Sequence, residues 1–154
     1  MGFLTEDTLV RYLRKLGLAN YYGQLCTKAT IIKDAAATQT LTAAMSGTVL
    51  RCAIDAVITL PAISGIDMKG VWYKIVNGAA SASTGLLIRP NAADGIGGMG
   101  LTGVVDKDLT NTPATDVLND FVVIECTGIP GASDTIGTGG WRIVDVQGIW
   151  AKEA

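Results

Sequence analysis

Residues Gly95 to Gly100 spell GIGGMG, which matches the G-x-G-x-x-G pattern of dinucleotide-binding loops. In such sites a strand leads into the loop and a helix follows it, so that the N-terminus of the helix meets the pyrophosphate. Here RPNAAD precedes the motif and LTGVVDKDLTNTP follows it, and neither stretch has the pattern of the required element. The segment is therefore predicted to be a flexible glycine-rich loop and not a phosphate site.

A second group with chemical potential is the acidic stretch DKDLTNTPATDVLND, which contains Asp106, Asp108, Asp116 and Asp120. Paired carboxylates can carry out acid–base catalysis or bind calcium. However, EF-hand spacing is absent, and Asp and Asn are also ordinary turn residues whose side chains bond nearby backbone amides. Solvated turns are the favoured interpretation, and a metal or catalytic site is the alternative.

The chain contains no histidine, which removes the commonest general base and the usual Ser/His and Cys/His nucleophile pairs. Its cysteines, Cys26, Cys52 and Cys126, are odd in number and far apart. That spacing argues against a disulfide framework and against a zinc site, so buried free thiols are expected. Neither enzymatic activity, nor a metal, nor a cofactor is predicted.

The aromatic residues Trp72, Tyr73, Trp141 and Trp150 offer one more possibility, a platform on which sugars stack. In a β-rich domain of this size, tryptophans more often fill the core or a contact between subunits. We therefore interpret Trp72, Trp141 and Trp150 as core residues or as residues of a subunit seam.

The elements that must position these residues are mainly strands. In TVLRCAIDAVITL, residues 48–60, every even position from Leu50 to Leu60 is apolar, whereas Arg51, Asp55 and Thr59 are polar. This alternation is typical of an antiparallel strand with one face on a core, and Pro61 ends or bends it. Four more strands are predicted at 71–77, 85–89, 121–127 and 141–147. The predicted fold is mainly β: an antiparallel sandwich, jelly-roll-like, or a barrel.

The N-terminal region differs from the rest because residues 6–16 have the pattern of a helix, between a Thr5 N-cap and Gly17. So short a helix is marginal alone, and its apolar stripe must dock on something. Residues 33–40, KDAAATQT, look like a connection. The predicted organisation is an N-terminal helix and arm over residues 1–35 and a β-sandwich domain over residues 36–154.

The composition narrows the class of partner. In 154 residues, 49% are hydrophobic and the formal net charge is −2, which predicts a globular fold without the basic surplus that nucleic acid requires. No apolar stretch is long enough to cross a bilayer, and the N-terminus lacks the apolar region of a signal peptide. We expect synthesis in a cytoplasm, and neither a nucleic acid nor a membrane as partner.

Four stretches together resemble small structural proteins of tailed-phage virions: TLTAAMSGTVLRCAIDAVITLPA, GVWYKIVN, NDFVVIECTG and GGWRIVDVQGIW. The shared features are an alternating strand that ends in LP, a short aromatic strand, an ADGIGG-like loop and a closing segment with two tryptophans. Over about residues 39–151 the chain looks like a capsid decoration, or cement, protein. Some tail-fibre and spike domains share these sequence features.

This resemblance implies a β-rich, often trimeric protein on the outside of an icosahedral shell. Its expected partners are the major capsid protein of the same virion and other copies of itself, and its expected location is the virion surface. The alternative function is a tail-fibre, spike or head-fibre domain that binds a host receptor or glycan.

On this interpretation the N-terminal arm contacts the partner. Its apolar contact residues are expected to be Phe3, Leu4, Leu9, Tyr12, Leu13 and Leu16. Basic residues on the opposite helix face can meet acidic groups at the rim, namely Arg11, Arg14 and Lys15. The alternative is that the helix packs on the sandwich of its own chain.

Overall fold

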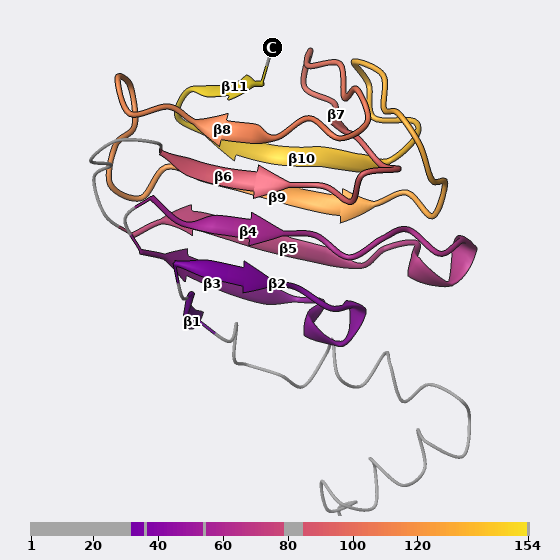
Figure 1. Cartoon of the computed structure of the whole chain (residues 1–154), viewed down its shortest axis with the longest axis horizontal. Coiled ribbons are helices and arrows are strands. Elements are labelled where there is room, and N and C mark those ends of the chain that lie inside the picture. The colour runs from indigo at the N-terminus through magenta and orange to yellow at the C-terminus, as the bar shows by residue number, and fades with distance from the viewer. Residues whose placement is uncertain (1–31, 36, 54, 79–84, 154) are drawn as a thin grey trace, which may run out of the picture. The chain divides into compact units, whose positions relative to one another are not determined.

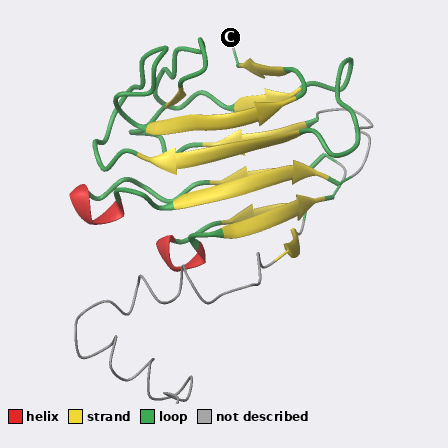
Figure 2. Ribbon diagram, turned by 180° about the vertical axis from the view of Figure 1, so that it is seen from behind, coloured by secondary structure: helices red, strands yellow, loops and turns green. Residues whose placement is uncertain are grey.

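In a computed structural model, the chain divides into two compact units, residues 1–30 and 31–154. The structure describes residues 32–35, 37–53, 55–78 and 85–153, all of which belong to the second unit. Within that unit, two β-sheets lie face to face, as Figures 1 and 2 show from opposite sides.

The described strands form one six-stranded and one five-stranded sheet. In spatial order, the first sheet contains β1 (Ile32–Ala35), β3 (Thr48–Cys52), β5 (Trp72–Asn77), β9 (Phe121–Cys126), β10 (Trp141–Gln147) and β7 (Ile96–Gly97). The second contains β11 (Trp150–Lys152), β8 (Leu109–Asn111), β6 (Leu86–Arg89), β4 (Val57–Thr59) and β2 (Thr38–Thr40). Two short 3₁₀ helices, η1 (Ala43–Met45) and η2 (Ile66–Met68), lie in connections. The described residues contain no helix that is long and apolar enough to cross a membrane.

From β1 to β6 the chain alternates between the two sheets. Each strand therefore runs in the same direction as the previous strand of its own sheet. As a result, β3 is parallel to β1 and β5, and β4 is parallel to β2 and β6. Antiparallel pairs enter with β8, β9, β10 and β11. The mainly β sandwich is confirmed, but its sheets are mixed and not purely antiparallel, and the described strands do not close into a barrel.

The alternating segment 48–60 forms two strands, so the prediction of one antiparallel strand is wrong. β3 and β4 lie in different sheets, and the chain turns between them with Asp55 at a φ of 53°. The predicted burial nevertheless holds at Leu50, Cys52, Ala56 and Ile58. Both strands present their even positions to the space between the sheets, so the alternation continues through the turn.

The core fills the space between the sheets. Trp141 is fully buried and packs at a tilt against Tyr73, with ring centroids 5.7 Å apart. The Tyr73 hydroxyl donates to the carbonyl oxygen of Thr42 at 2.8 Å, which satisfies the polar end of this buried ring. Aliphatic side chains from both sheets complete the core, among them Leu50, Ile58, Ile75, Ile88, Leu109, Val122 and Ile124. Burying each such side chain contributes about 1.5–3 kcal/mol.

Two of the cysteines belong to this core. Cys52 and Cys126 are buried free thiols, as predicted, whereas Cys26 lies outside the described residues. Burial raises the pKa of the Cys52 thiol to about 12 and also raises the pKa of Cys126. Both side chains therefore behave as small apolar groups at neutral pH.

The segment 33–40, predicted to be a connection, instead contains most of β1 and all of β2. Both strands lie at the edge of their sheets, beside β3 and β4. Two of the three β2 side chains are exposed. Edge strands tolerate polar and small residues, so the hydrophobic pattern that identifies a central strand is missing here.

Candidate functional site

The glycine-rich motif contains a short strand and a tight turn, whereas the sequence predicted a loop throughout. Ile96 and Gly97 form β7, which pairs in parallel with the start of β10. Gly98 and Leu101 then exchange backbone hydrogen bonds of 2.9 and 3.0 Å around Met99 and Gly100. The two central residues have φ values of 51° and 91°, so this is a two-residue turn of the type I′ class.

The glycines of the motif allow backbones to approach where a Cβ would not fit. A Cβ on Gly95 would lie 2.4 Å from the carbonyl oxygen of Gly103, and one on Gly97 would lie 2.7 Å from the carbonyl oxygen of Asp134. These glycines therefore permit loops to pack against each other. Their match to a dinucleotide-binding pattern is accounted for by this packing.

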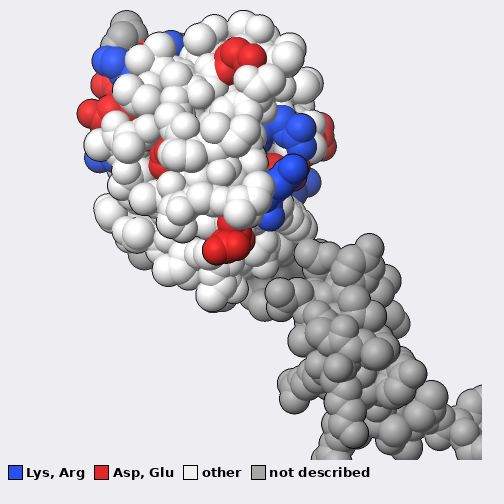
Figure 3. All heavy atoms as spheres, turned by 90° about the vertical axis from the view of Figure 1, so that its right-hand side faces the viewer, with Lys and Arg blue, Asp and Glu red and all other residues white. Residues whose placement is uncertain are grey.

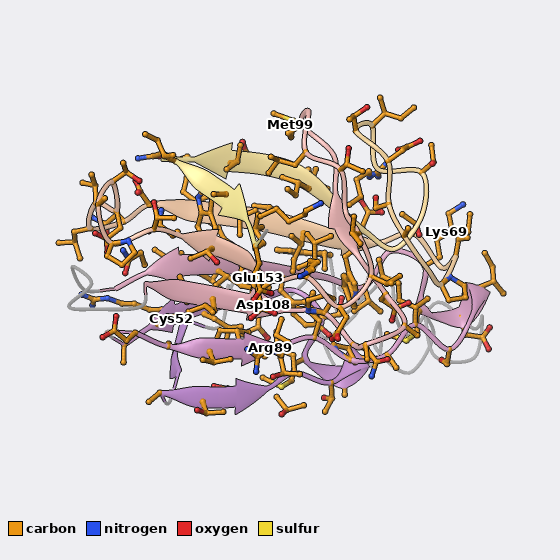
Figure 4. The ribbon with its side chains drawn as sticks, turned by 45° about the horizontal axis from the view of Figure 1, so that its top comes forward. Cys52, Lys69, Arg89, Met99, Asp108 and Glu153 are labelled. Atoms are coloured by element: carbon orange, nitrogen blue, oxygen red, sulfur yellow. The ribbon has the colours of Figure 1, made fainter. Side chains whose placement is uncertain are left out.

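At the β7 end of the sandwich, adjacent loops each expose a large apolar side chain, and we call Met99, Val104 and Ile136 the apolar tip. Backbone hydrogen bonds join the loops: Gly100 N donates to Thr135 O at 3.1 Å, and Gly103 and Ser133 exchange two bonds of 2.8 Å. Met99 lies at the outer end of its loop (Figure 4). The apolar tip is thus a projection built from loops that brace one another.

Met99 combines exposure with an unfavourable backbone conformation. Four described non-glycine residues have a positive φ, and the other three are Asp55, Asp106 and Asn119. Asp and Asn tolerate this conformation, whereas it costs other residues about 1–2 kcal/mol. Asn-Gly is the preferred pair in a type I′ turn, yet this turn carries Met-Gly with the methionine 63% exposed. Backbone strain of this kind is characteristic of binding sites.

Carboxylates hold the loops around the tip in place. Asp134 accepts hydrogen bonds from Ile136 N at 3.1 Å and from Thr138 N and Oγ1 at 2.9 and 2.7 Å. These bonds, those from Thr138 first, lower the pKa of Asp134. The buried Asp94 accepts from Ile63 N at 2.9 Å and from Gly131 N at 3.1 Å, which ties two further loops together.

The same end of the molecule exposes further apolar side chains. Ile66 and Ile129 are both largely exposed, in loops that follow the ends of the strands on this side. Figure 3 views this end, where uncharged surface predominates and charged groups are scattered. Apolar surface with few charges is the composition found at the centres of protein–protein interfaces.

The opposite end of the sandwich is joined by a buried polar cluster. Asn77 on β5 donates to Asn111 on β8 at 3.1 Å and to Asp116 at 3.2 Å, so it links the two sheets. Asn111 in turn donates to Asp120 at 3.1 Å and to the carbonyl oxygen of Ile149 at 3.0 Å. The cluster fixes the loop before β9 and the turn before β11, and its role is structural.

The acidic stretch does not gather its carboxylates at one site. Asp108 binds Arg89 near the start of β8, whereas Asp116 and Asp120 belong to the polar cluster at the other end. The solvated-turn interpretation is wrong for Asp108 and Asp120, which are buried, while Asp106 is exposed. Among the described residues, no group of three His, Cys, Asp or Glu side chains could hold a metal ion.

The tryptophans lie in different environments. Trp141 and Trp150 are buried in their own chain, and the Trp150 indole donates to Gln147 O at 3.0 Å. For these two the core interpretation is confirmed. Trp72 lies on the outer face of the first sheet and is half-buried. Part of its side chain is therefore accessible to a neighbouring subunit. A seam at Trp72 stays a prediction.

The predicted arm contacts lie outside the described residues: Phe3, Leu4, Leu9, Arg11, Tyr12, Leu13, Arg14, Lys15 and Leu16. Conversely, the residues of the apolar tip were not identified from the sequence. Their only signal was a large apolar residue within a Gly- or Asp-rich loop, as in GMG and DTIGTG.

Comparison with known proteins finds no family model that matches the chain and no curated protein with significant sequence similarity. Function is therefore inferred from the surface of the sandwich and from the resemblance of its strands.

Proposed function

We propose that this chain is a structural virion protein that binds the outside of a tailed-phage capsid and stabilises the shell as a trimeric decoration protein. The observation that carries the proposal is where three of the resembling stretches lie. GVWYKIVN, NDFVVIECTG and the first nine residues of GGWRIVDVQGIW supply β5, β9 and β10, which are neighbours in one sheet, while Trp150 at the end of the third stretch begins β11 in the other sheet. Three stretches that are separate in the sequence thus lie side by side in one sheet, which is the arrangement that a shared fold would require.

The exposed end of the sandwich supports a protein as the partner. Large apolar side chains at the ends of ordered loops offer area that another protein can cover. A shell presents many copies of one site, and a symmetric trimer engages several of them together. Modest individual contacts then gain strength through effective concentration.

Stabilisation of the shell requires binding alone and no catalytic reaction. A ligand that binds only the assembled shell stabilises it relative to the dissociated state. Calorimetry of empty shells from the phage that encodes the chain tests this, with and without saturating protein. We expect a higher melting temperature for decorated shells, and an unrelated acidic protein of equal mass serves as the control. Equal melting temperatures at full occupancy would contradict the proposal.

The location of the bound protein gives a second test. Electron microscopy of virions mixed with the protein is expected to show density over the capsid lattice. Density at a tail tip, or binding to a glycan array, would instead support a receptor-binding fibre domain and count against the decoration function.

The predicted role of the N-terminal arm is tested separately by deletion of residues 2–17. If the arm contacts the shell, the shortened protein binds shells more weakly in a sedimentation assay. Full-strength binding by the shortened protein would show that the arm does not make the contact.

A further inference from the structure

We infer that the apolar tip is the part of the sandwich that docks on the shell protein, with Met99 inserted in an apolar pocket that has a basic residue at its rim. This inference rests on the proposed function and adds to it the contacting surface and the chemistry of the partner. Three independent features of the described residues support it: the backbone of Met99, the bracing of the loops, and the charge beside the tip.

The first feature is that the fold does not explain Met99. Its side chain is exposed and fills no space in the core. Its positive φ is one that Asp, Asn or Gly would adopt more easily. A bulky apolar side chain in a strained and exposed position is accounted for by a contact with another molecule.

The second feature is that the tip is pre-organised. The Met99 turn is closed by two backbone hydrogen bonds, and the loop that carries Ile136 is held by the Asp134 carboxylate. Gly103 and Ser133 join the loop of Val104 to that of Ile136. Binding therefore loses little loop entropy, which favours affinity. Since the tip projects outward, the complementary surface on the partner is a recess.

The third feature defines the chemistry of that recess. Asp134 is exposed beside Ile136, and an exposed aspartate is negatively charged at neutral pH. The nearby Arg142 is already paired with Glu125 at 2.8 Å and so does not cancel this charge. The recess that fits the tip covers a thioether and two aliphatic side chains, and a lysine or arginine at its rim complements the charge of Asp134.

The test uses Met99→Asn, because asparagine suits the positive φ of the turn while it removes the apolar side chain. The variant should melt at the same temperature as the wild type or higher. Its affinity for empty shells, measured by co-sedimentation of the full-length chain, should fall by about tenfold or more. Met99→Leu, which keeps an apolar side chain, should retain affinity within a few-fold.

The matched control is Val117→Asn, because Val117 is 62% exposed, as Met99 is 63%, and lies at the opposite end of the sandwich. Its affinity should stay within about twofold of the wild type, the ordinary range for residues outside an interface core. A loss equal to that of Met99→Asn would show a general effect of exposed apolar area, and would overturn the inference.

The remaining outcomes separate the inference from the proposed function. If wild type and Met99→Asn bind shells equally well, the inference is wrong and the decoration function stands. If the wild type does not bind shells, both fall. If Met99→Asn lowers the mass of the free protein in light scattering, the tip joins copies of this chain, and the inference is overturned.

Discussion

The ion pair between Arg89 and Asp108 links an exposed side chain to a buried one. The Asp108 side chain is 4% exposed and that of Arg89 is 52% exposed. Arg89 donates from Nε and Nη2 to the carboxylate, with distances of 2.8–3.2 Å, and these bonds raise the pKa of Arg89. Glu153 N donates to the carbonyl oxygen of Asp108, so the end of β11 passes the same point (Figure 4).

Removing the arginine should therefore leave a buried carboxylate without its main donor. We expect Arg89→Ala to lower the free energy of unfolding by about 1–3 kcal/mol, measured by urea denaturation. The matched control is Arg142→Ala, whose partner Glu125 is more exposed, and its expected cost is below about 1 kcal/mol. Equal costs for the two variants would show that burial of Asp108 does not set the strength of its ion pair.

Burial of Cys52 predicts a dependence of stability on pH. Its pKa is raised to about 12 in the folded chain, above the ordinary value of about 8.5–9, so the folded state holds its proton more tightly. This contribution is complete below pH 9 and is lost as the pH rises toward 12, by up to about 1.4 kcal/mol per pH unit.

Two measurements check this expectation. Urea midpoints should fall between pH 9 and 10.5, and less steeply in Cys52→Ala. In a Cys26→Ser background, the folded protein should also react slowly with thiol reagents at pH 8 and quickly after unfolding. Rapid reaction of the folded protein would show that the two remaining thiols, Cys52 and Cys126, are not both protected as the structure indicates.

At the scale of elements, the short turn between β10 and β11 depends on a single glycine. Gly148 has a φ of 90°, and a Cβ there would lie 2.2 Å from the carboxyl carbon of Asp120. Asp120 accepts from Asn111 and from Val117 N, so it cannot move without disturbing the polar cluster. The turn, the cluster and the loop before β9 therefore form one structural unit.

Gly148→Ala should disrupt this unit, and Gly100→Ala is its matched control. The φ of Gly100 is 91°, almost the same, but a Cβ there would meet nothing within 4 Å. The control should cost about 1–2 kcal/mol through backbone strain alone. Gly148→Ala should cost at least about 2 kcal/mol more, as measured by denaturant unfolding. Similar costs for the two variants would mean that the Asp120 side chain moves away from the added Cβ with little loss of stability.

At the scale of the whole molecule, the core cluster is composed of residues between Leu41 and Trp150, all within the second compact unit. A hydrophobic core of its own is the feature that allows a domain to fold alone. The β5–β9 pairing and the cross-sheet bond between Asn77 and Asn111 join strands that are distant in sequence. The sandwich is therefore expected to unfold as one cooperative unit.

Removal of residues 1–30 tests this expectation. The remaining chain should melt in one transition, within about 4 °C of the full-length protein, because a shift of that size corresponds to less than about 1 kcal/mol. Calorimetry measures both quantities. A loss of more than about 10 °C, or a second transition, would show that residues 1–30 contribute to the stability of the core.

Much of this fold could be predicted from local sequence because the burial of strands has a period of two. The alternation in 121–127 and 141–147 identified β9 and β10 nearly to the residue, and the same parity located Leu50 and Ile58 in the core. The edge strands β1 and β2 could not be found in this way, since small and polar residues at a sheet edge leave no hydrophobic pattern.

The amino-acid sequence by itself determined the mainly β class, the buried thiols of Cys52 and Cys126, and the side of each central strand that faces the core, because these follow from local hydrophobicity. Only the tertiary structure decided that 48–60 divides between two sheets and that its strands pair in parallel, because pairing depends on where distant segments return. Tertiary structure also separated the acidic residues and brought Met99, Val104 and Ile136 to one projection. That arrangement depends on backbone hydrogen bonds between loops 30 and 35 residues apart, Gly103 with Ser133 and Gly100 with Thr135, which no local pattern encodes.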